Sequence, residues 1–298
     1  MKIGYRRFAG GIALSANESL VRSHWTEKRR NFIAGLIGRG HEVTMMSGPT
    51  RGSRGLFEYD ETAKVDVLII EQGMQDYYFG AKDLTKTLAI IERHEGRVVY
   101  VCDDPDLFPK PDLHIDYSNW LFAVNCLYPE RIELPAPAVD FPMMPIKLFY
   151  EPPRNVEATA SYVGRPNGRG RQVKSFLATG LLEIYGAAKD WKAYDVQIHP
   201  APKGHERYVV MRRHAYSLSL FDSKHAKYGW RTGRAYHSLN AGVPVVVSSG
   251  NDALSWAEVI EPQDLSHFVS QPPATRHEIL NKQRLSAWQS PSWEAIGL

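Results

Sequence analysis

The sequence predicts an α/β fold with two Rossmann-like halves and a cleft between them. Short apolar runs alternate with amphipathic helical patterns in both halves, as in βαβ units with parallel sheets. A cluster of prolines at residues 135–153 separates the halves and reads as a linker. We therefore expect ligands at the carboxyl ends of the strands, facing that cleft.

The first half has four runs that we expect to be strands, at residues 1–5, 42–47, 65–70 and 97–102. The helix between the first two ends at Gly38 and Gly40, and its apolar face holds Trp25, Phe32, Ile33, Leu36 and Ile37. A second helix is expected from Leu84 to Arg93. We assign residues 1–150 to an N-terminal domain.

The second half repeats this pattern, with strands expected near 158–163, 181–185, 215–221 and 243–248. A helix over 231–241 precedes the last of these strands. We assign residues 151–275 to a C-terminal domain. The tail, 276–298, has a helical pattern, and we expect it to pack back toward the N-terminal domain.

Composition excludes some classes of protein. The chain has 298 residues, 43% of them apolar and 23% charged, which is typical of a globular protein. No run of apolar residues reaches the length of a membrane span, so we expect no membrane partner. The only two cysteines, Cys102 and Cys126, suit a reducing compartment, and no zinc-ligand spacing is present. A net charge of +3 neither requires nor excludes nucleic acid.

A stretch at residues 162–188 has the pattern of an anion-binding loop. An apolar run stops at Gly164, a loop rich in glycine and arginine follows, and then a helix begins. The free N–H groups and the dipole of a helix N-terminus favour phosphate. Positive charge to compensate a diphosphate is available from Arg165, Arg169, Arg171 and Lys174. The alternative is a loop with solvated arginines before an ordinary surface helix.

Two further places carry candidate chemistry. Asp103 and Asp104 end a buried strand, where a carboxylate can take a proton from an attacking hydroxyl, although aspartate before proline is more often a turn residue. Arg234 begins a predicted helix and His237 lies one turn later on the same face. Two-domain nucleotide-sugar transferases place diphosphate and ribose contacts here; the alternative is a packed helix with arginines in water.

Several segments together resemble a known family, the DNA β-glucosyltransferases of T-even bacteriophages, which are two-domain transferases of the GT-B fold. The resemblance is collinear over nearly the whole chain. It is carried by the first strand, DYYFGAKDLTKTLAIIERHEGRVVYVCDD, FPMMPI, YVGRPNGRGRQVKSFLATGLLEIYGAA, TGRAYHSLNAGVPVV and HEILNKQRLSAWQ. Their shared order and spacing make the match more specific than any one of them.

The resemblance implies an inverting glycosyltransferase that uses a UDP-sugar, with UDP-glucose expected. It implies that the domain 1–150 binds the DNA acceptor and the domain 151–275 binds the nucleotide sugar. The acceptor would be a 5-hydroxymethylated pyrimidine, 5-hydroxymethylcytosine or 5-hydroxymethyluracil, in double-stranded phage DNA. It further implies that Asp104 is the catalytic base, or Asp103 if the alignment shifts by one residue, and that Glu27 lies near the donor sugar. Assistance by a divalent metal, Mg²⁺ or Mn²⁺, is implied for product release, without a dedicated set of protein ligands.

For the donor, Gly164 and Arg171 match the phosphate loop. Asn167 replaces its first arginine, so Arg165 or Arg169 must take over that contact. Further matches are Arg234 to the diphosphate arginine, His237 to a ribose-binding glutamate, and Tyr185 and Gly186 to the segment beside the uracil. Histidine is not an equivalent acceptor for ribose hydroxyls, so the replacement leaves the choice of donor open.

For the acceptor, the basic residues of the first domain are the candidates for phosphate contacts on either side of an extruded base: Arg6, Arg7, Lys28, Arg29 and Arg30. The alternative is that they only solvate the first strand–helix junction. We expect a monomer in the cytoplasm of the infected host cell. Two other functions stay open: transfer to a glycan or small molecule, and a catalytically inactive nucleotide- or DNA-binding protein on this scaffold.

Overall fold

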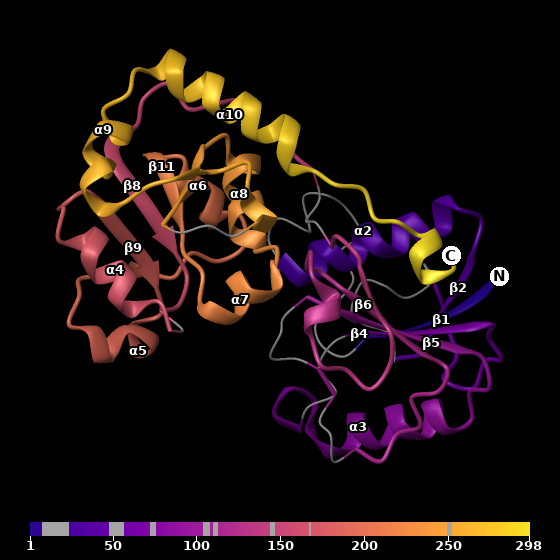
Figure 1. Ribbon diagram of the computed structural model, residues 1–298. Coiled ribbons are helices and arrows are strands. Elements are labelled where there is room, and N and C mark those ends of the chain that lie inside the picture. Colours follow the sequence, from indigo (N-terminus) through magenta and orange to yellow (C-terminus); the bar gives the residue numbers. More distant parts are fainter. Residues whose placement is uncertain are drawn as a thin grey trace. The chain divides into compact units, whose positions relative to one another are not determined.

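The computed structural model describes residues 1–7, 24–47, 57–71, 76–103, 108–109, 113–143, 147–166, 168–248 and 252–298, and only the backbone of 24–27 and 76–83. It divides into two units, which are described separately (Figure 1). The first contains most of the chain up to Met143 together with Ser290–Leu298, and the second contains residues 144–289. The tail assigned to one segment, 276–298, is thus divided at Gln289.

Among the described residues, the first unit is built on a seven-stranded parallel sheet of order β3-β2-β1-β4-β5-β6-β7. The strands are β1 (Lys2–Arg6), β2 (Glu42–Met45), β3 (Glu58–Tyr59), β4 (Val67–Glu71), β5 (Arg97–Cys102), β6 (Trp120–Val124) and β7 (Ala138–Asp140). The strand order reverses between β1 and β4. Such a switch point leaves an opening at the carboxyl ends of the strands, where open α/β sheets bind ligands.

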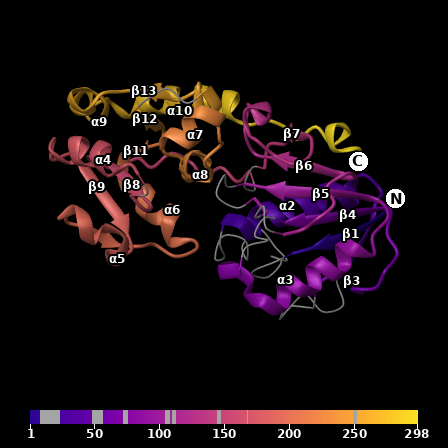
Figure 2. The ribbon, with the colours of Figure 1, turned by 60° about the horizontal axis from the view of Figure 1, so that its bottom comes forward.

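Two long helices cover opposite faces of this sheet, α2 (His24–Gly38) and α3 (Asp76–Glu92), as Figures 1 and 2 show. Phe32, Ile33 and Leu36 of α2 enter a core with alternating residues of the central strands. The C-terminal segment completes this core, because Trp293 packs against Phe32 at a centroid distance of 5.1 Å. A Cβ atom on Gly35 would overlap the Trp293 ring, so α2 carries a glycine there.

The second unit has a six-stranded parallel sheet of order β10-β9-β8-β11-β12-β13 among its described residues. The strands are β8 (Glu157–Val163), β9 (Leu182–Gly186), β10 (His199–Pro200), β11 (His214–Ser219), β12 (Val245–Val247) and β13 (Glu258–Val259). From β8 the chain adds β9 and β10 on one side and then β11, β12 and β13 on the other. This sheet therefore has a switch point between β8 and β11.

Helices pack on both faces of this second sheet. α4 (Gly170–Leu177), α5 (Ala188–Trp191) and α9 (Leu265–Val269) share one hydrophobic cluster. Two other hydrophobic clusters lie against this sheet. One contains Val245 and residues of α8 (Gly233–Ala241) and α10 (Pro273–Ala287), and the other contains Val243 and residues of α6 (Glu206–Met211). The clusters take alternate residues of β12, Val246 on one side and Val245 and Val247 on the other. One short helix, α7 (Ser223–Tyr228), follows β11.

The expected α/β architecture of two parallel sheets is confirmed, and eight predicted strands match observed ones within a few residues. Five observed strands were not predicted: β3, β6, β7, β10 and β13. Part of the proline cluster belongs to β7 of the first unit. The helix expected from Leu84 begins earlier, at Asp76. Within the described parts of the chain, no helix is both long and apolar enough to cross a bilayer.

Candidate active site

A tight glycine turn lies where β8 ends. Gly164 has φ of 153°, a conformation that side chains rarely adopt, and a Cβ atom there would overlap the guanidinium of Arg234. The indole Nε1 of Trp191 donates to the Gly164 carbonyl at 3.0 Å. A Cβ atom on Gly186 would overlap that indole. Glycine is therefore required at both strand ends because three elements approach each other closely.

Two helices begin at this carboxyl edge without a side-chain cap. α4 starts at Gly170 and α8 at Gly233, and neither Arg169 nor Thr232 caps its helix through a side-chain hydrogen bond. The first N–H groups of a helix have no partner within the helix. Two uncapped N-termini at one edge of a sheet favour a bound anion.

Arg234, the second residue of α8, provides the most direct sign of an anion site. Its guanidinium lies 4.6 Å from the centre of the Tyr162 ring and forms no ion pair with any carboxylate among the described residues. Burial lowers the pKa of Arg234, and the nearby positive charge of Arg169 adds to this effect against the influence of Tyr162. A half-buried cation without a counterion is stabilised when an anion binds beside it.

The arginines of the loop before α4 differ in their surroundings. Arg169 is nearly buried, and its Nη2 donates to Asp222 Oδ2 at 3.0 Å. Asp222 also accepts from the backbone and ring of His225, and these contacts, with Arg169, hold its pKa well below the usual range although burial opposes this. Arg165 pairs at the surface with Asp190, at 3.1 Å.

Arg171 is exposed on the first turn of α4, and no ion pair to a described carboxylate restrains it. It is therefore available to an anion at the helix N-terminus. Asn167, the residue that departs from the family's arginine, lies outside the described residues.

His237 is buried and held from both sides of its ring. Nε2 lies 3.1 Å from Nη1 of Arg207, and Nδ1 lies 2.9 Å from the Tyr208 hydroxyl. Because arginine can only donate, Nε2 accepts and Nδ1 carries the proton. Arg207, which the sequence analysis did not single out, thus accompanies the histidine that stands in place of a glutamate.

Tyr185 is also engaged within the protein. Its hydroxyl donates to Glu183 at 2.8 Å and contacts His214, while its ring stacks on His199. The predicted contact of Tyr185 and Gly186 with uracil stays a prediction.

In the first unit, a fixed carboxylate follows β5 at the same edge as the switch point. Asp103 is 7% exposed in its side chain and lies 2.5 Å from Lys28 Nζ. The Asn125 amide donates to its other oxygen, and Asn125 is itself held by the backbone N–H of Met143 at 3.1 Å. Asp104 lies outside the described residues, as does the side chain of Glu27 on α2.

Three of the five basic residues expected to contact DNA are not exposed. Arg29 and Glu71 form an ion pair with both side chains fully buried, and Tyr5 donates to the same carboxylate at 2.8 Å. Arg6 is buried against Thr87 and the Met46 carbonyl. Further contacts of Arg6 and Lys28 go to Glu61 and Asp103. The expectation of an exposed basic rim is therefore corrected for Arg6, Lys28 and Arg29, which are buried and pair with carboxylates of the same unit. For Arg7 and Arg30 it stays a prediction.

Several residues that shape these sites were missed in the sequence. Tyr162, Asp222, Asn125 and Glu71 bind or orient the candidates from distant segments. Glu71 gave a usable signal, because a carboxylate directly ends the apolar run VLIIE beside the strand that begins the sheet. The other three show no pattern of their own and become visible only through their contacts.

No protein-family model matches the sequence, and no curated protein is similar to it. Among solved structures, the chain is similar to the DNA-modifying enzyme β-glucosyltransferase studied with and without uridine diphosphoglucose, with a TM-score of 0.68 and 14% identity over 96% of each chain. It is also similar to the T4 phage β-glucosyltransferase in complex with UDP-glucose, with a TM-score of 0.64, and with UDP and Mn²⁺, with a TM-score of 0.63. Both complexes share 12% identity with it over 96% of each chain. The likeness confirms the resemblance at the level of the fold.

Proposed function

We propose that this protein is an inverting glycosyltransferase that moves a sugar, with glucose expected, from a UDP-sugar to a 5-hydroxymethylated pyrimidine in double-stranded DNA. The observation that carries the proposal is Arg234. Its guanidinium has no carboxylate partner among the described residues and lies against Gly164 and Tyr162, at an edge where two helices begin uncapped. This is the chemistry that a nucleoside diphosphate requires.

On the donor side, we assign the diphosphate to Arg234, to the exposed Arg171 and to the first N–H groups of α4. Negative charge grows on the diphosphate as its bond to the sugar breaks, so donors already in place stabilise the transition state more than the bound donor. Arg169 has a positioning role, because its bond to Asp222 ties the loop before α4 to the start of α7.

On the acceptor side, we assign the base to the carboxylate pair after β5 and place Asp103 first. Lys28 Nζ and the Asn125 amide each contact one of its oxygens and so orient the carboxylate. In the proposed reaction the carboxylate takes the proton of the hydroxymethyl group. The oxygen then attacks the anomeric carbon from the face opposite the diphosphate, and the departure of UDP inverts that carbon. A base in duplex DNA must leave the stack for this contact.

A protein-bound metal is not part of this mechanism. Among the described residues, the one group of three metal-ligating side chains comprises Glu157, Glu183 and His214, at the amino ends of the strands and thus away from the Gly164 turn. The two carboxylates at the loop before α4, Asp190 and Asp222, are paired with Arg165 and Arg169. The other groups around Arg234 are cations and N–H groups, which do not ligate Mg²⁺ or Mn²⁺. We therefore assign no step to a metal ion.

A second acceptor class is favoured by the burial of Arg6, Lys28 and Arg29. Three basic residues expected to neutralise DNA phosphates instead satisfy carboxylates inside the first unit. The same donor site and base would serve a hydroxyl group of a glycan or a small molecule.

One experiment separates these acceptors. The protein is incubated with UDP-glucose and other UDP-sugars, together with duplexes containing hydroxymethylcytosine, hydroxymethyluracil or unmodified bases, and the nucleosides are analysed by mass spectrometry. We expect a hexose on a hydroxymethylated base only, and none with the Arg234→Met variant. Turnover of UDP-sugar without transfer to any duplex would refute the DNA acceptor and retain the transferase. If no UDP-sugar binds or turns over, the donor assignment fails as well.

A further inference from the structure

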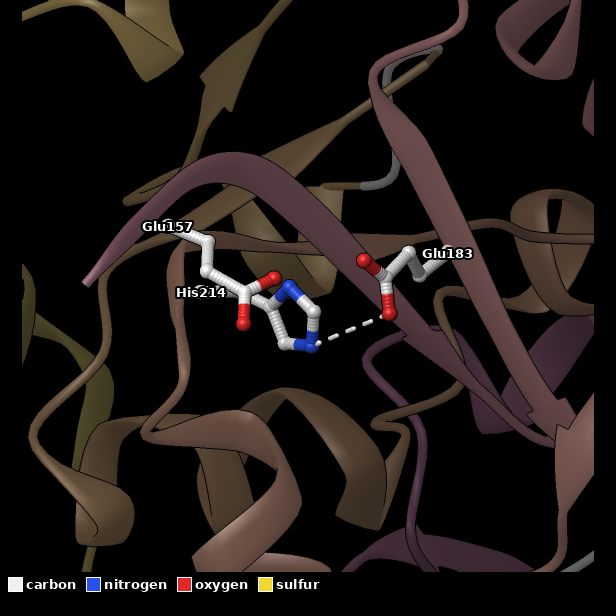
Figure 3. Close-up of side chains that lie close together, drawn as sticks. All are labelled: Glu157, Glu183 and His214. Atoms are coloured by element: carbon white, nitrogen blue, oxygen red, sulfur yellow. Dashed lines mark ion pairs between the residues drawn. The ribbon is translucent and has the colours of Figure 1, made fainter.

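Three metal-ligating side chains gather at the amino ends of three neighbouring strands in the second unit. Glu157 is the first residue of β8, Glu183 lies near the start of β9, and His214 is the first residue of β11. One ligand atom from each lies within 4.8 Å of the others. Figure 3 shows both carboxylates turned toward the His214 ring. The ring is buried, Glu183 is half-buried and Glu157 is exposed, so the cluster is open to solvent on one side only.

The surroundings hold the histidine and one carboxylate in fixed positions. Thr159 Oγ1 lies 2.8 Å from Nδ1 of His214, which leaves Nε2 to face Glu183 Oε2 at 3.9 Å. The Tyr185 hydroxyl donates to Glu183 at 2.8 Å and lies 3.1 Å from Nε2. Metal-binding histidines and carboxylates usually have such outer partners, which orient them and select the tautomer.

We propose that Glu157, Glu183 and His214 bind a divalent transition-metal ion of the Zn²⁺ or Mn²⁺ kind. One imidazole nitrogen and two carboxylates are donors that these ions accept, whereas Mg²⁺ and Ca²⁺ prefer oxygen alone.

The geometry requires only a small adjustment to close around an ion. Two ligands at about 2.0–2.1 Å from one tetrahedral zinc ion lie roughly 3.3 Å apart, so Nε2 and the Glu183 oxygen must approach each other by about half an ångström. The Glu157 side chain begins at the surface and is free to turn. Because the Tyr185 hydroxyl gives its one proton to Glu183, its contact with Nε2 places the ring proton of His214 on Nε2. Binding an ion at Nε2 requires this proton to move to Nδ1, where the Thr159 hydroxyl can accept it.

The ion would be structural, with its ligands near the amino ends of the strands. Glu157 and Gly164 stand at opposite ends of β8, which separates them by about 20 Å at the rise of a β-strand. A metal at the amino ends would link β8, β9 and β11, the three central strands of this sheet. The proposal therefore does not depend on the transferase function.

The test is a titration of the chelator-treated, full-length protein with ZnCl₂, and separately with MnCl₂, by calorimetry without nucleotide. We expect one equivalent of Zn²⁺ to bind, to raise the melting temperature and to shift the ring ¹⁵N resonances of His214. In Glu157→Gln the affinity should fall by more than about tenfold. This variant changes an exposed side chain at the start of a strand, so it should fold; Thr159→Val should weaken binding through the tautomer.

Glu258→Gln is the matched control, because Glu258 is also the exposed first residue of a strand in the same sheet. It should bind Zn²⁺ like the wild type. The proposal is overturned if the wild type binds neither metal at millimolar concentration, or if Glu157→Gln binds as tightly as the wild type.

Discussion

Replacing Arg234 by methionine should separate ligand affinity from stability. Methionine keeps much of the length of the side chain beside Tyr162 and Gly164 but removes the charge and all five donors. If Arg234 binds the diphosphate, UDP affinity should fall by about 1.5–3 kcal/mol, the value of a hydrogen bond to a charged group. This corresponds to a dissociation constant about 10- to 150-fold higher.

The stability of the free protein should respond differently. Removing one partner of a buried ion pair usually costs about 3–5 kcal/mol, because the other charge is left unpaired. Arg234 has no carboxylate partner among the described residues, and burial lowers its pKa, so the folded state does not favour its charge. We therefore expect the free energy of unfolding of Arg234→Met to be unchanged or higher than that of the wild type.

Calorimetric titration with UDP and urea denaturation without ligand measure the two quantities on the same samples. Arg154→Met is the matched control, since Arg154 is an exposed arginine of the same unit and should change neither value. Unchanged UDP affinity in Arg234→Met would refute the donor site. A loss of stability as large as that of a broken ion pair would refute the view that this cation lacks an internal partner.

Three other changes test the remaining features. Asp103→Asn should reduce turnover by about two to four orders of magnitude with UDP affinity unchanged. If Asp103→Asn instead turns over at the wild-type rate and Asp104→Asn loses activity, the catalytic base is Asp104. Glu71→Gln should cost about 3–5 kcal/mol in urea denaturation, because Arg29 is left buried without its carboxylate, and a cost under 1 kcal/mol would contradict this. In metal-free protein the free energy of unfolding should fall as the pH drops from about 6.5 to 4, because the unfolded chain binds a proton that the buried His214 ring does not. The fall should be on the order of 2–3 kcal/mol in the wild type and smaller in His214→Gln. Equal pH profiles of the wild type and His214→Gln would exclude this contribution of His214.

The predicted features that hold are those encoded locally. Continuous apolar runs such as 97–102 and 158–163 mark strands buried on both faces, and glycines at their ends mark turns. Gly164 is an example. The residues around it predict a strand followed by a helix, and the structure explains the glycine, because a Cβ atom there would overlap the guanidinium of Arg234. β7 was missed because its residues, Ala138–Asp140, lie among prolines, which in short segments are typical of linkers.

The sequence could not reveal whether a basic residue is exposed, because that depends on remote partners. Arg29 and Glu71 are 42 positions apart, and Lys28 and Asp103 are 75 apart. A run such as Lys28-Arg29-Arg30 looks like one basic patch, yet helix geometry points neighbouring residues in different directions. Only Arg30 of these three is partly exposed.

The position of Trp293 has a consequence for how the protein is made. Most of the second unit is the stretch 144–289, which in the sequence precedes Ser290–Leu298, a segment of the first unit that is therefore synthesised after it. Until this segment leaves the ribosome, Phe32 and Phe141 lack the indole that packs between them at 5.1 and 5.3 Å. The core of the first unit therefore becomes complete only after most of the second unit has been synthesised, when Trp293 can pack beside Gly35.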